Sequence, residues 1–362
     1  MKRISAIVDL KAISNNLYQV TKHLPENVKK IAVIKANAYG HGAVEVAKHL
    51  EENAQVKDFA VATLEEATEL RENGIKGDIL VLGYIETEDA YIAQKLDITV
   101  SVGSIEYARE LFSKGSPKAH LQIDTGMSRM GVYCHKADDV DEALEEIKKI
   151  WEVSNGNITG IYTHFVESEN QRSPFTEAQY NALTSLISRC ENEGIYFKTK
   201  HCCNSLGAIN FGKFALDAVR IGICLYGYES DKVKLTPAMT FKTKIIKIFE
   251  GKKGDTVSYN GTYTLEEDKR IAVCGAGYAD GVSRQLSNKG YYVVNEKKAN
   301  VLGRVCMDLS MIDVSHIDCK VGDEAIIFGK ELPADEVAKL CNTISYETLC
   351  SVGKRVPREY VK

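Results

Sequence analysis

The chain has 362 residues, of which 44% are hydrophobic and 27% are charged, and its formal net charge at pH 7 is −4. This length predicts two domains, or one large barrel with an added domain, and the composition is that of a globular protein with a large core. No basic stripe indicates binding to nucleic acid, and no apolar run approaches the roughly 20 residues that a membrane-spanning helix needs.

The number and spacing of the cysteines indicate the cellular compartment of the protein. Ten cysteines are spread along the chain without a C-x-x-C pair. In a chain long enough to bury a large core, this favours reduced, buried thiols over a disulfide framework. The start of the chain alternates Ile4, Ala6 and Val8 with other residues and lacks the apolar block of a signal peptide. We therefore expect a cytoplasmic protein without a metal site.

Short apolar runs alternate with amphipathic helical patterns over the first two-thirds of the chain. The clearest helical pattern covers 139–153, Ser104 is expected to cap a helix that ends near Gly115, and Gly74 is expected to cap one over 65–73. The strand-like runs are 31–35, 59–62, 79–83, 98–102, 120–124, 158–164, 197–203 and 218–223. Eight such runs between helices predict an α/β fold with a parallel (β/α)8 TIM barrel. A doubly wound open sheet is the alternative, but its G-x-G-x-x-G pattern is missing from the first strand–helix junction.

The pattern changes near residue 230 to short strands with turn residues between them. Strands are expected over 238–249, 254–263, 270–276, 291–295, 301–314 and 324–328, with helices over 333–341 and 345–351. We therefore predict a barrel domain over 10–230 and a mostly β domain over 231–362. The N-terminal run, within residues 1–9, is expected to pair with the second domain.

One segment combines a strand-end lysine with two glycines. Lys35 follows an apolar strand in Ala-Val-Ile-Lys35-Ala-Asn-Ala-Tyr39-Gly40-His-Gly42. A buried ammonium is costly unless it is paired or used chemically, and barrels place active sites at the carboxyl ends of their strands. Lysine forms Schiff bases with pyridoxal phosphate, and glycines let the backbone approach a ligand closely. The alternative is a lysine that reaches solvent from the end of its strand.

These residues, with the motifs Asp124-Thr-Gly-Met-Ser-Arg129 and Tyr-Thr-His164-Phe, resemble the alanine racemase family of fold-type III pyridoxal-phosphate enzymes. The resemblance covers essentially the whole chain, with several motifs in the family's order. It implies that Lys35 carries the cofactor and that Tyr39 contacts its phosphate. It further implies that Arg129 bonds the cofactor's phenolic oxygen and contacts substrate, and that His164 lies at the cofactor site.

Two more barrel segments are expected at the cofactor. Asn204 and Ser205 follow the seventh strand, and the loops after strands seven and eight commonly bind phosphate. Ser205 offers a hydroxyl group, while Gly222 and Ile223 offer backbone N–H groups.

The eighth strand carries Arg220, which matches the family's arginine at the pyridine nitrogen. An arginine is effectively always protonated, so it donates to that nitrogen and leaves the ring unprotonated. Less charge is then delocalised into the ring, which favours prompt return of the proton to the α-carbon.

The second domain is expected to supply the other face of the site. By the resemblance, a strand carries the catalytic Tyr259, Tyr278 lies near the substrate entrance, and the segment with Met307 reaches the substrate carboxylate. In the family these residues come from the partner subunit, which implies a homodimer with shared active sites. The implied reaction is two-base racemisation of a small amino acid, L-alanine to D-alanine, with Lys35 and Tyr259 on opposite faces. D-alanine is a precursor of peptidoglycan.

Two positions depart from the family pattern. Many members carry a carbamylated lysine where this chain has Gln122, so we expect no carbamate here; Gln122 can still accept a hydrogen bond from Arg129. The family usually reads Ser-Tyr-Arg-Val-Pro-Arg near the C-terminus, where this chain has Lys354 in place of the tyrosine. In the family, loss of that tyrosine accompanies acceptance of serine or larger side chains, so a serine or broader-specificity racemase is the alternative.

Two further alternatives remain. A fold-type III decarboxylase also pairs a barrel with a β domain, but Arg220 at the pyridine position speaks against the strong electron sink of such enzymes. A non-catalytic pyridoxal-phosphate carrier would be a lone barrel, without the second domain and its Tyr259.

Overall fold

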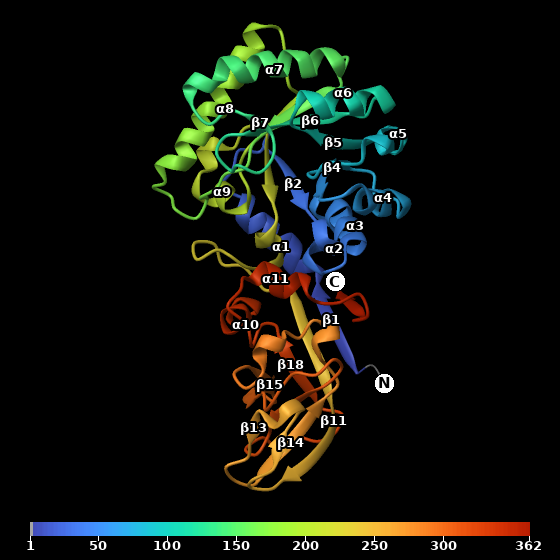
Figure 1. Ribbon diagram of the computed structural model, residues 1–362, viewed down its shortest axis with the longest axis vertical. Helices are drawn as coiled ribbons and strands as arrows, with labels where there is room; N and C mark the ends of the chain where they lie inside the picture. The colour runs from blue at the N-terminus through green and yellow to red at the C-terminus, as the bar shows by residue number, and fades with distance from the viewer. Residues whose placement is uncertain (1–2) are drawn as a thin grey trace.

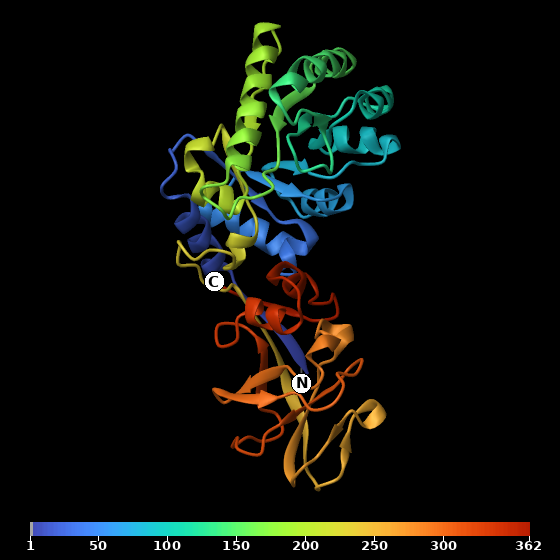
Figure 2. The same cartoon turned by 60° about the vertical axis from the view of Figure 1, so that its left-hand side comes forward.

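The computed structural model describes residues 3–362, which form a barrel and a second, mostly β domain that lies below the barrel along the long axis of the molecule (Figures 1 and 2). The barrel strands lie in the order β5-β4-β3-β2-β10-β9-β8-β6, and β5 pairs with β6 to close the ring. All of these pairings are parallel, so the predicted eight-stranded barrel is confirmed. The strands are β2 (Lys29–Val33), β3 (Asp58–Val61), β4 (Asp78–Val81), β5 (Ile98–Val102), β6 (Ala119–Asp124), β8 (Ile158–Tyr162), β9 (Thr199–His201) and β10 (Ala218–Ile221).

Helices surround the barrel and follow its strands. Each packs an apolar stripe against the sheet, as in α7, where five residues of the predicted stripe are buried. The capping predictions also hold: the hydroxyl of Ser104 accepts a hydrogen bond from the backbone of Tyr107 at 3.2 Å, and Gly74 follows α4 with φ +87°. The helices are α1 (Leu10–Thr21), α3 (Ala43–Ala54), α4 (Leu64–Glu72), α5 (Ala90–Lys95), α6 (Ile105–Lys114), α7 (Val140–Val153), α8 (Pro174–Asn192) and α9 (Ser205–Asn210).

Six of the eight barrel strands end one or two residues earlier than their sequence runs predict, and β2 and β8 are among them. β2 ends at Val33, and the amide of Ile34 makes the last bond to the neighbouring strand, to Ala60. Lys35 therefore lies just beyond the strand, in the short helical turn α2 (Lys35–Tyr39). β8 likewise ends at Tyr162, so His164 also follows its strand. Both side chains are at the carboxyl end of the barrel.

The second domain is built around the long strand β11 (Met239–Gly251). One sheet runs β16-β15-β18-β11-β1-β19, and β14 with β17 continues from the far half of β11. β1 (Ile4–Asp9) precedes the barrel in sequence but pairs with β11, and residues 1 and 2 of the predicted pairing segment lie outside the described residues. The remaining elements are β14 (Lys269–Cys274), β15 (Tyr291–Val294), β16 (Lys297–Asn300), β17 (Ser310–Asp313), β18 (Glu324–Phe328), α10 (Ala334–Leu340), α11 (Ser345–Cys350) and β19 (Arg358–Val361).

The predictions for two strands of this domain are wrong in part. The run 254–263 splits into β12 (Thr256–Val257) and β13 (Tyr263–Thr264) around a 3-10 turn, η5 (Tyr259–Gly261). Positive φ values at Ser258 (66°) and Asn260 (61°) turn the chain out of the extended conformation. Of the run 301–314, only β17 is a strand, and Met307 lies in the loop before it.

Within residues 3–362, no helix is long and apolar enough to span a bilayer.

Candidate active site

A pocket of about 490 Å³ opens among the carboxyl ends of the barrel strands, and we call it the carboxyl-end pocket. It brings together side chains from loops that are far apart in sequence, as this end of a parallel barrel commonly does. Nine of the predicted site residues line it: Lys35, Tyr39, Arg129, His164, Asn204, Ser205, Arg220, Gly222 and Ile223.

The backbone that follows Lys35 is left-handed over four consecutive residues. From Ala36 to Tyr39 every φ lies between 51° and 54°, a conformation that costs an L-residue roughly 1–2 kcal/mol. The carboxylate of Glu66, on α4, accepts hydrogen bonds from the backbone N–H of Ala36 (2.5 Å) and of Asn37 (3.4 Å). Glu66 therefore offsets part of the strain and fixes the turn that aims Lys35 into the pocket.

The Lys35 ammonium is disfavoured at this position. Burial lowers the pKa of Lys35, and the positive charges of Arg129 and, more weakly, Arg220 lower it further. The charge of Glu66 acts in the opposite direction without reversing the shift. A larger fraction of Lys35 is therefore neutral, and so nucleophilic, than of an exposed lysine at the same pH.

Arg220 is buried across the floor of the pocket, and its terminal nitrogens are fully engaged. Nη2 donates to the carbonyls of Thr163 (2.8 Å) and Cys202 (3.0 Å), while Nη1 donates to Nδ1 of His201 at 2.6 Å. Among the described residues, no partner is found for its Nε–H. This group is the donor that Arg220 retains for a ligand.

His164 lies beside Arg220, with its Nδ1 at 3.4 Å from Nη2 of the guanidinium. Burial and the nearby charges of Arg220 and Arg129 lower the pKa of His164 to about 3. The imidazole is therefore neutral at physiological pH and adds no further positive charge to the pocket.

A second group of side chains gathers where strands β9 and β10 end. A Cβ placed on Gly222 would lie 2.8 Å from the Tyr39 hydroxyl. The lack of a side chain at Gly222 therefore lets this hydroxyl lie close to the backbone. The Gly222 N–H donates to Oγ of Ser205 at 2.8 Å. The expectation that this N–H is free for a ligand is therefore wrong for this structure, whereas the Ser205 hydroxyl retains its own proton to donate. The side chain of Asn204 accepts from the backbone of Gly207 at 2.9 Å and caps α9.

Arg129 lies on the loop after β6. Oδ1 of Asp124 accepts from the backbone of Gly126 and Ser128, both at 3.0 Å, which fixes the loop and directs the exposed Arg129 over the pocket. Gln122 lies buried on β6, and its Oε1 has no hydrogen-bond partner among residues 3–362. The expected bond from Arg129 to Gln122 is therefore not formed.

Four predicted site residues lie outside the carboxyl-end pocket, all on the second domain. Tyr259 is 67% exposed, Met307 53% and Tyr278 44%, and Lys354 is exposed in the loop between α11 and β19. Tyr259 lies between β12 and β13, and Figure 1 shows β13 at the end of the molecule opposite the barrel. In a single chain this tyrosine is therefore remote from Lys35.

Three aromatic residues that line the pocket, Tyr162, Phe165 and Tyr346, were not among the predicted site residues. Tyr162 ends β8, and its ring lies 5.3 Å from the Arg220 guanidinium carbon. It stands two residues before His164, and alternation along the strand could have indicated it. Tyr346 comes from α11 of the second domain, which contacts α2. No local pattern marks Tyr346, because its place depends on how the two domains pack.

Two family models match the chain consecutively. The one described as "Alanine racemase, N-terminal domain" matches residues 8–230, and "Alanine racemase, C-terminal domain" matches residues 238–360. The chain belongs to the alanine racemase family. Among curated members of the family, the alanine racemase of Desulforamulus reducens is 41% identical, with 99% of each chain covered. That of Clostridium perfringens is 38% identical over 100% of this chain and 96% of its own.

Solved alanine racemase structures share the architecture. The enzyme of Clostridium difficile 630 superposes with a TM-score of 0.93 at 36% identity, over 99% of this chain and 96% of that one. The enzyme of Bacillus anthracis, with bound L-Ala-P, superposes with a TM-score of 0.92 at 33% identity, over 100% and 96%. The barrel with an added β domain is thus the family's fold.

Proposed function

We propose that this chain is a pyridoxal-phosphate-dependent racemase that converts L-alanine to D-alanine. The observation that carries the proposal is Lys35, a lysine with a lowered pKa held by a strained turn in a pocket at the carboxyl end of the barrel. The family membership and the relatives' names, all alanine racemases, support the same reaction.

The side chains around the pocket fit pyridoxal phosphate. Lys35 offers an amine, and the hydroxyls of Tyr39 and Ser205, both beside Gly222, offer hydrogen-bond donors where a phosphate would be held. The unused Nε–H of Arg220 suits an acceptor such as the pyridine nitrogen. We propose that Arg129 donates to the phenolic oxygen, that His164 lines the ring, and that Asn204 and Ile223 complete the phosphate end. Gly222 provides the space beside the Tyr39 hydroxyl there rather than a free N–H group.

When bound, pyridoxal phosphate supplies an aldehyde that joins a primary amine and a conjugated ring that withdraws electrons from the α-carbon. Lys35 would hold the cofactor at rest. When it is not joined to the cofactor, the neutral Nζ of Lys35 could take or return the α-proton on its own face of the substrate. Its lowered pKa favours this role, because a protonated lysine could only donate.

The opposite face needs a second base, because one base that returns the proton to the same side gives back the starting enantiomer. We propose that Tyr259 of a second copy is this base. Its side chain is 67% exposed on the second domain and remote from the pocket of its own chain. Tyr278, Met307 and Lys354 lie on the same domain, and we propose that they approach the substrate in the same manner, in a homodimer with shared sites.

Subunit mixing tests this proposal. Lys35→Ala and Tyr259→Phe are each expected to abolish most racemisation as pure dimers. In a mixed dimer one site carries both lesions and the other carries neither. Co-expression of the two variants should therefore restore about a quarter of the wild-type rate, since half of randomly formed dimers are mixed. A matched mixture of Lys35→Ala with Lys35→Arg should restore no activity. If the first mixture restores no activity either, the shared site is rejected.

A racemase of serine or of broader specificity is the second candidate. The observation that favours it is Lys354, which stands exposed where the family pattern has tyrosine. A decarboxylase is less well supported, because Arg220 presents a donor rather than a carboxylate to the pocket. The domain limits 10–230 and 231–362 and a cytoplasmic location stay predictions.

A further inference from the structure

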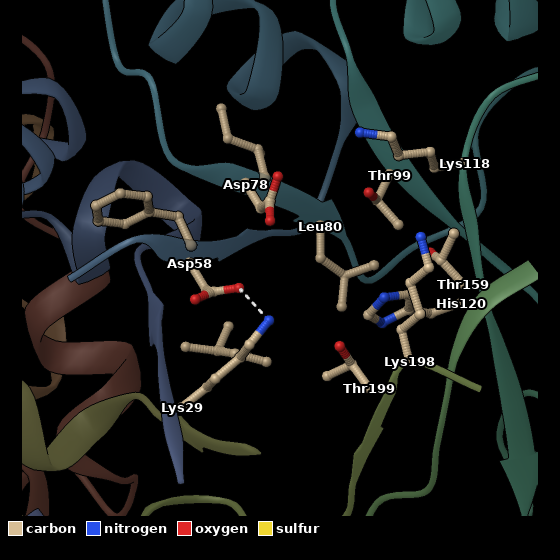
Figure 3. A pocket seen from close by; sticks show the side chains of 13 residues that line it. Lys29, Asp58, Asp78, Leu80, Thr99, Lys118, His120, Thr159, Lys198 and Thr199 are labelled. Carbon is tan, nitrogen blue, oxygen red and sulfur yellow. Dashed lines mark ion pairs between the residues drawn. The ribbon is translucent and has the colours of Figure 1, made fainter. Parts of the chain in front are cut away.

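The amino-terminal mouth of the barrel contains a cavity of about 200 Å³, opposite the carboxyl-end pocket. Charged residues at the starts of the strands surround it, and Lys29 lies 4.0 Å from Asp58. The imidazole of His120, on β6, points into this cavity between Leu80 and Thr199 (Figure 3). No hydrogen-bond partner of its Nε2 is found among residues 3–362. The reaction proposed above does not use this cavity.

A line of hydrogen bonds connects this cavity to Arg220 through the barrel axis. Nη1 of Arg220 lies 2.6 Å from Nδ1 of His201, and Nε2 of His201 lies 3.0 Å from Nδ1 of His120. Each residue comes from a different strand, β10, β9 and β6 in turn. The axis of this barrel is therefore polar, whereas barrel interiors are usually filled with branched aliphatic side chains.

The direction of these bonds follows from the chemistry of arginine. A guanidinium only donates, so Nδ1 of His201 must accept and the ring proton of His201 must lie on Nε2. That N–H then donates to Nδ1 of His120, which places the proton of His120 on Nε2, toward the cavity. Burial is the main cause that lowers the pKa of both imidazoles, that of His120 to about 3, so both rings are neutral.

The packing around the two rings keeps them in this arrangement. The ring of Tyr162 stacks on His201 at 4.8 Å with an interplanar angle of 5°. Gly160 on β8 pairs with His120, and a Cβ there would lie 2.6 Å from two atoms of the His120 ring. Glycine inside a strand weakens it, and at this position it provides the space that the imidazole occupies.

We propose that His120 is a positioning residue: by accepting a hydrogen bond from the Nε2–H of His201, it keeps His201 in the tautomer that receives Arg220 and so leaves Arg220 Nε aimed at the cofactor pocket. Without this acceptor, the Nε2–H of His201 would be buried without a partner. A shift of that proton to Nδ1 would then bring two donors face to face and displace the guanidinium. The role of Arg220 toward the cofactor rests on the proposed function, whereas the tautomers do not.

The first experiment measures histidine tautomers in the wild-type, cofactor-free protein by ¹⁵N NMR at neutral pH. His120 and His201 are expected to carry their protons on Nε2. His41 is an internal control with the opposite tautomer, because its Nδ1 lies 3.0 Å from the carbonyls of Ala38 and Tyr39 and must donate. A proton on Nδ1 of His120, or a charged His120, would overturn the proposal whether or not the protein is a racemase.

The second experiment compares His120→Leu with His120→Gln, since glutamine can still accept from His201. The leucine variant should shift the ¹⁵N signals of His201 and of Arg220 Nε and weaken pyridoxal-phosphate binding about tenfold. The glutamine variant should show wild-type ¹⁵N signals and wild-type cofactor affinity. The His41 signals should stay unchanged in both variants. Unchanged Arg220 Nε signals and cofactor affinity in the leucine variant would contradict the proposal. If both variants fail to fold, the wild-type tautomers still decide it.

Discussion

The ionisation of Lys35 depends on its neighbours. Arg129 is the charged residue that most lowers the pKa of Lys35, after the effect of burial itself. Arg129→Gln should therefore raise this pKa in the cofactor-free protein. The pH dependence of amine labelling at Lys35, followed by mass spectrometry, measures the change. Arg109→Gln, at an exposed arginine on α6, is the control and should leave the midpoint unchanged. A midpoint that stays or falls in Arg129→Gln would contradict this account.

Substrate choice is expected to depend on Lys354. An aromatic ring at this position would narrow the space beside the substrate side chain, which penalises serine more than alanine. Lys354→Tyr should therefore shift the kcat/KM ratio toward alanine by about tenfold, the size that one small group commonly contributes in a pocket. Lys339→Tyr, at an exposed lysine of α10, should not change the ratio. An unchanged ratio in Lys354→Tyr would remove Lys354 from the specificity site.

At the scale of elements, the turn after Lys35 depends on helix α4. Glu66 accepts hydrogen bonds from Ala36 and Asn37 in the turn and from Ala62 (2.8 Å) before the helix. Glu66→Ala should lower the free energy of unfolding by roughly 1–3 kcal/mol and weaken cofactor binding, because the strained turn loses its acceptor. Glu65→Ala removes the exposed neighbouring carboxylate and should have little effect. Chemical denaturation of the two variants compares them, and equal losses would assign no special role to Glu66.

The barrel strands could be predicted because parallel strands that are buried on both sides read as continuous apolar runs. Strands at sheet edges lack this signal: β16 reads Lys-Lys-Ala-Asn, and β19 alternates half-buried with exposed residues. The break in the strand around Tyr259 has a sequence signal that the strand prediction overlooked, because Asn260-Gly261 is typical of a tight turn, whereas Ser258 gives no sign of its positive φ.

The site residues likewise divide into those that could be predicted from the sequence and those that could not. Lys35 and Arg220 could be placed from sequence, because the end of a barrel strand fixes where its residues lie. The left-handed turn could not be predicted, since Ala36 and Ala38 have no preference for positive φ and the tertiary contact with Glu66 helps to maintain the turn. Tyr346 and the link from His201 to His120 likewise exist only through packing between distant segments.

For the whole molecule, neutral buried histidines predict acid lability. The pKa values of His41, His120 and His164 are lowered to about 4, 3 and 3, mainly by burial. The unfolded chain therefore binds protons below pH ~6.5 that the folded chain refuses, and stability falls as the pH drops from there toward 4. Each such histidine contributes a slope of up to about 1.4 kcal/mol per pH unit within this window.

Urea unfolding of the cofactor-free protein at pH 7, 6 and 5 measures this slope. His41→Asn should flatten it, while His316→Asn, at an exposed histidine, should not. An equal slope in the wild type and in His41→Asn would show that His41 takes up no protons on unfolding.

The pairing of β1 has a consequence for how the chain is made. Ile4, Ala6 and Val8 are fully or nearly fully buried, yet the partners of this strand are β11, which starts at Met239, and β19, which starts at Arg358. At typical synthesis rates, roughly 10–50 s pass between the emergence of the first strand and that of its first partner. For most of that time the barrel is incomplete as well, because its last strand, β10, ends at Ile221, and the apolar first strand keeps an unpaired backbone. The growing chain thus carries an aggregation-prone end whose first partner is made after the whole barrel and whose second partner, β19, is made last. Chaperone dependence during synthesis should be concentrated at this end.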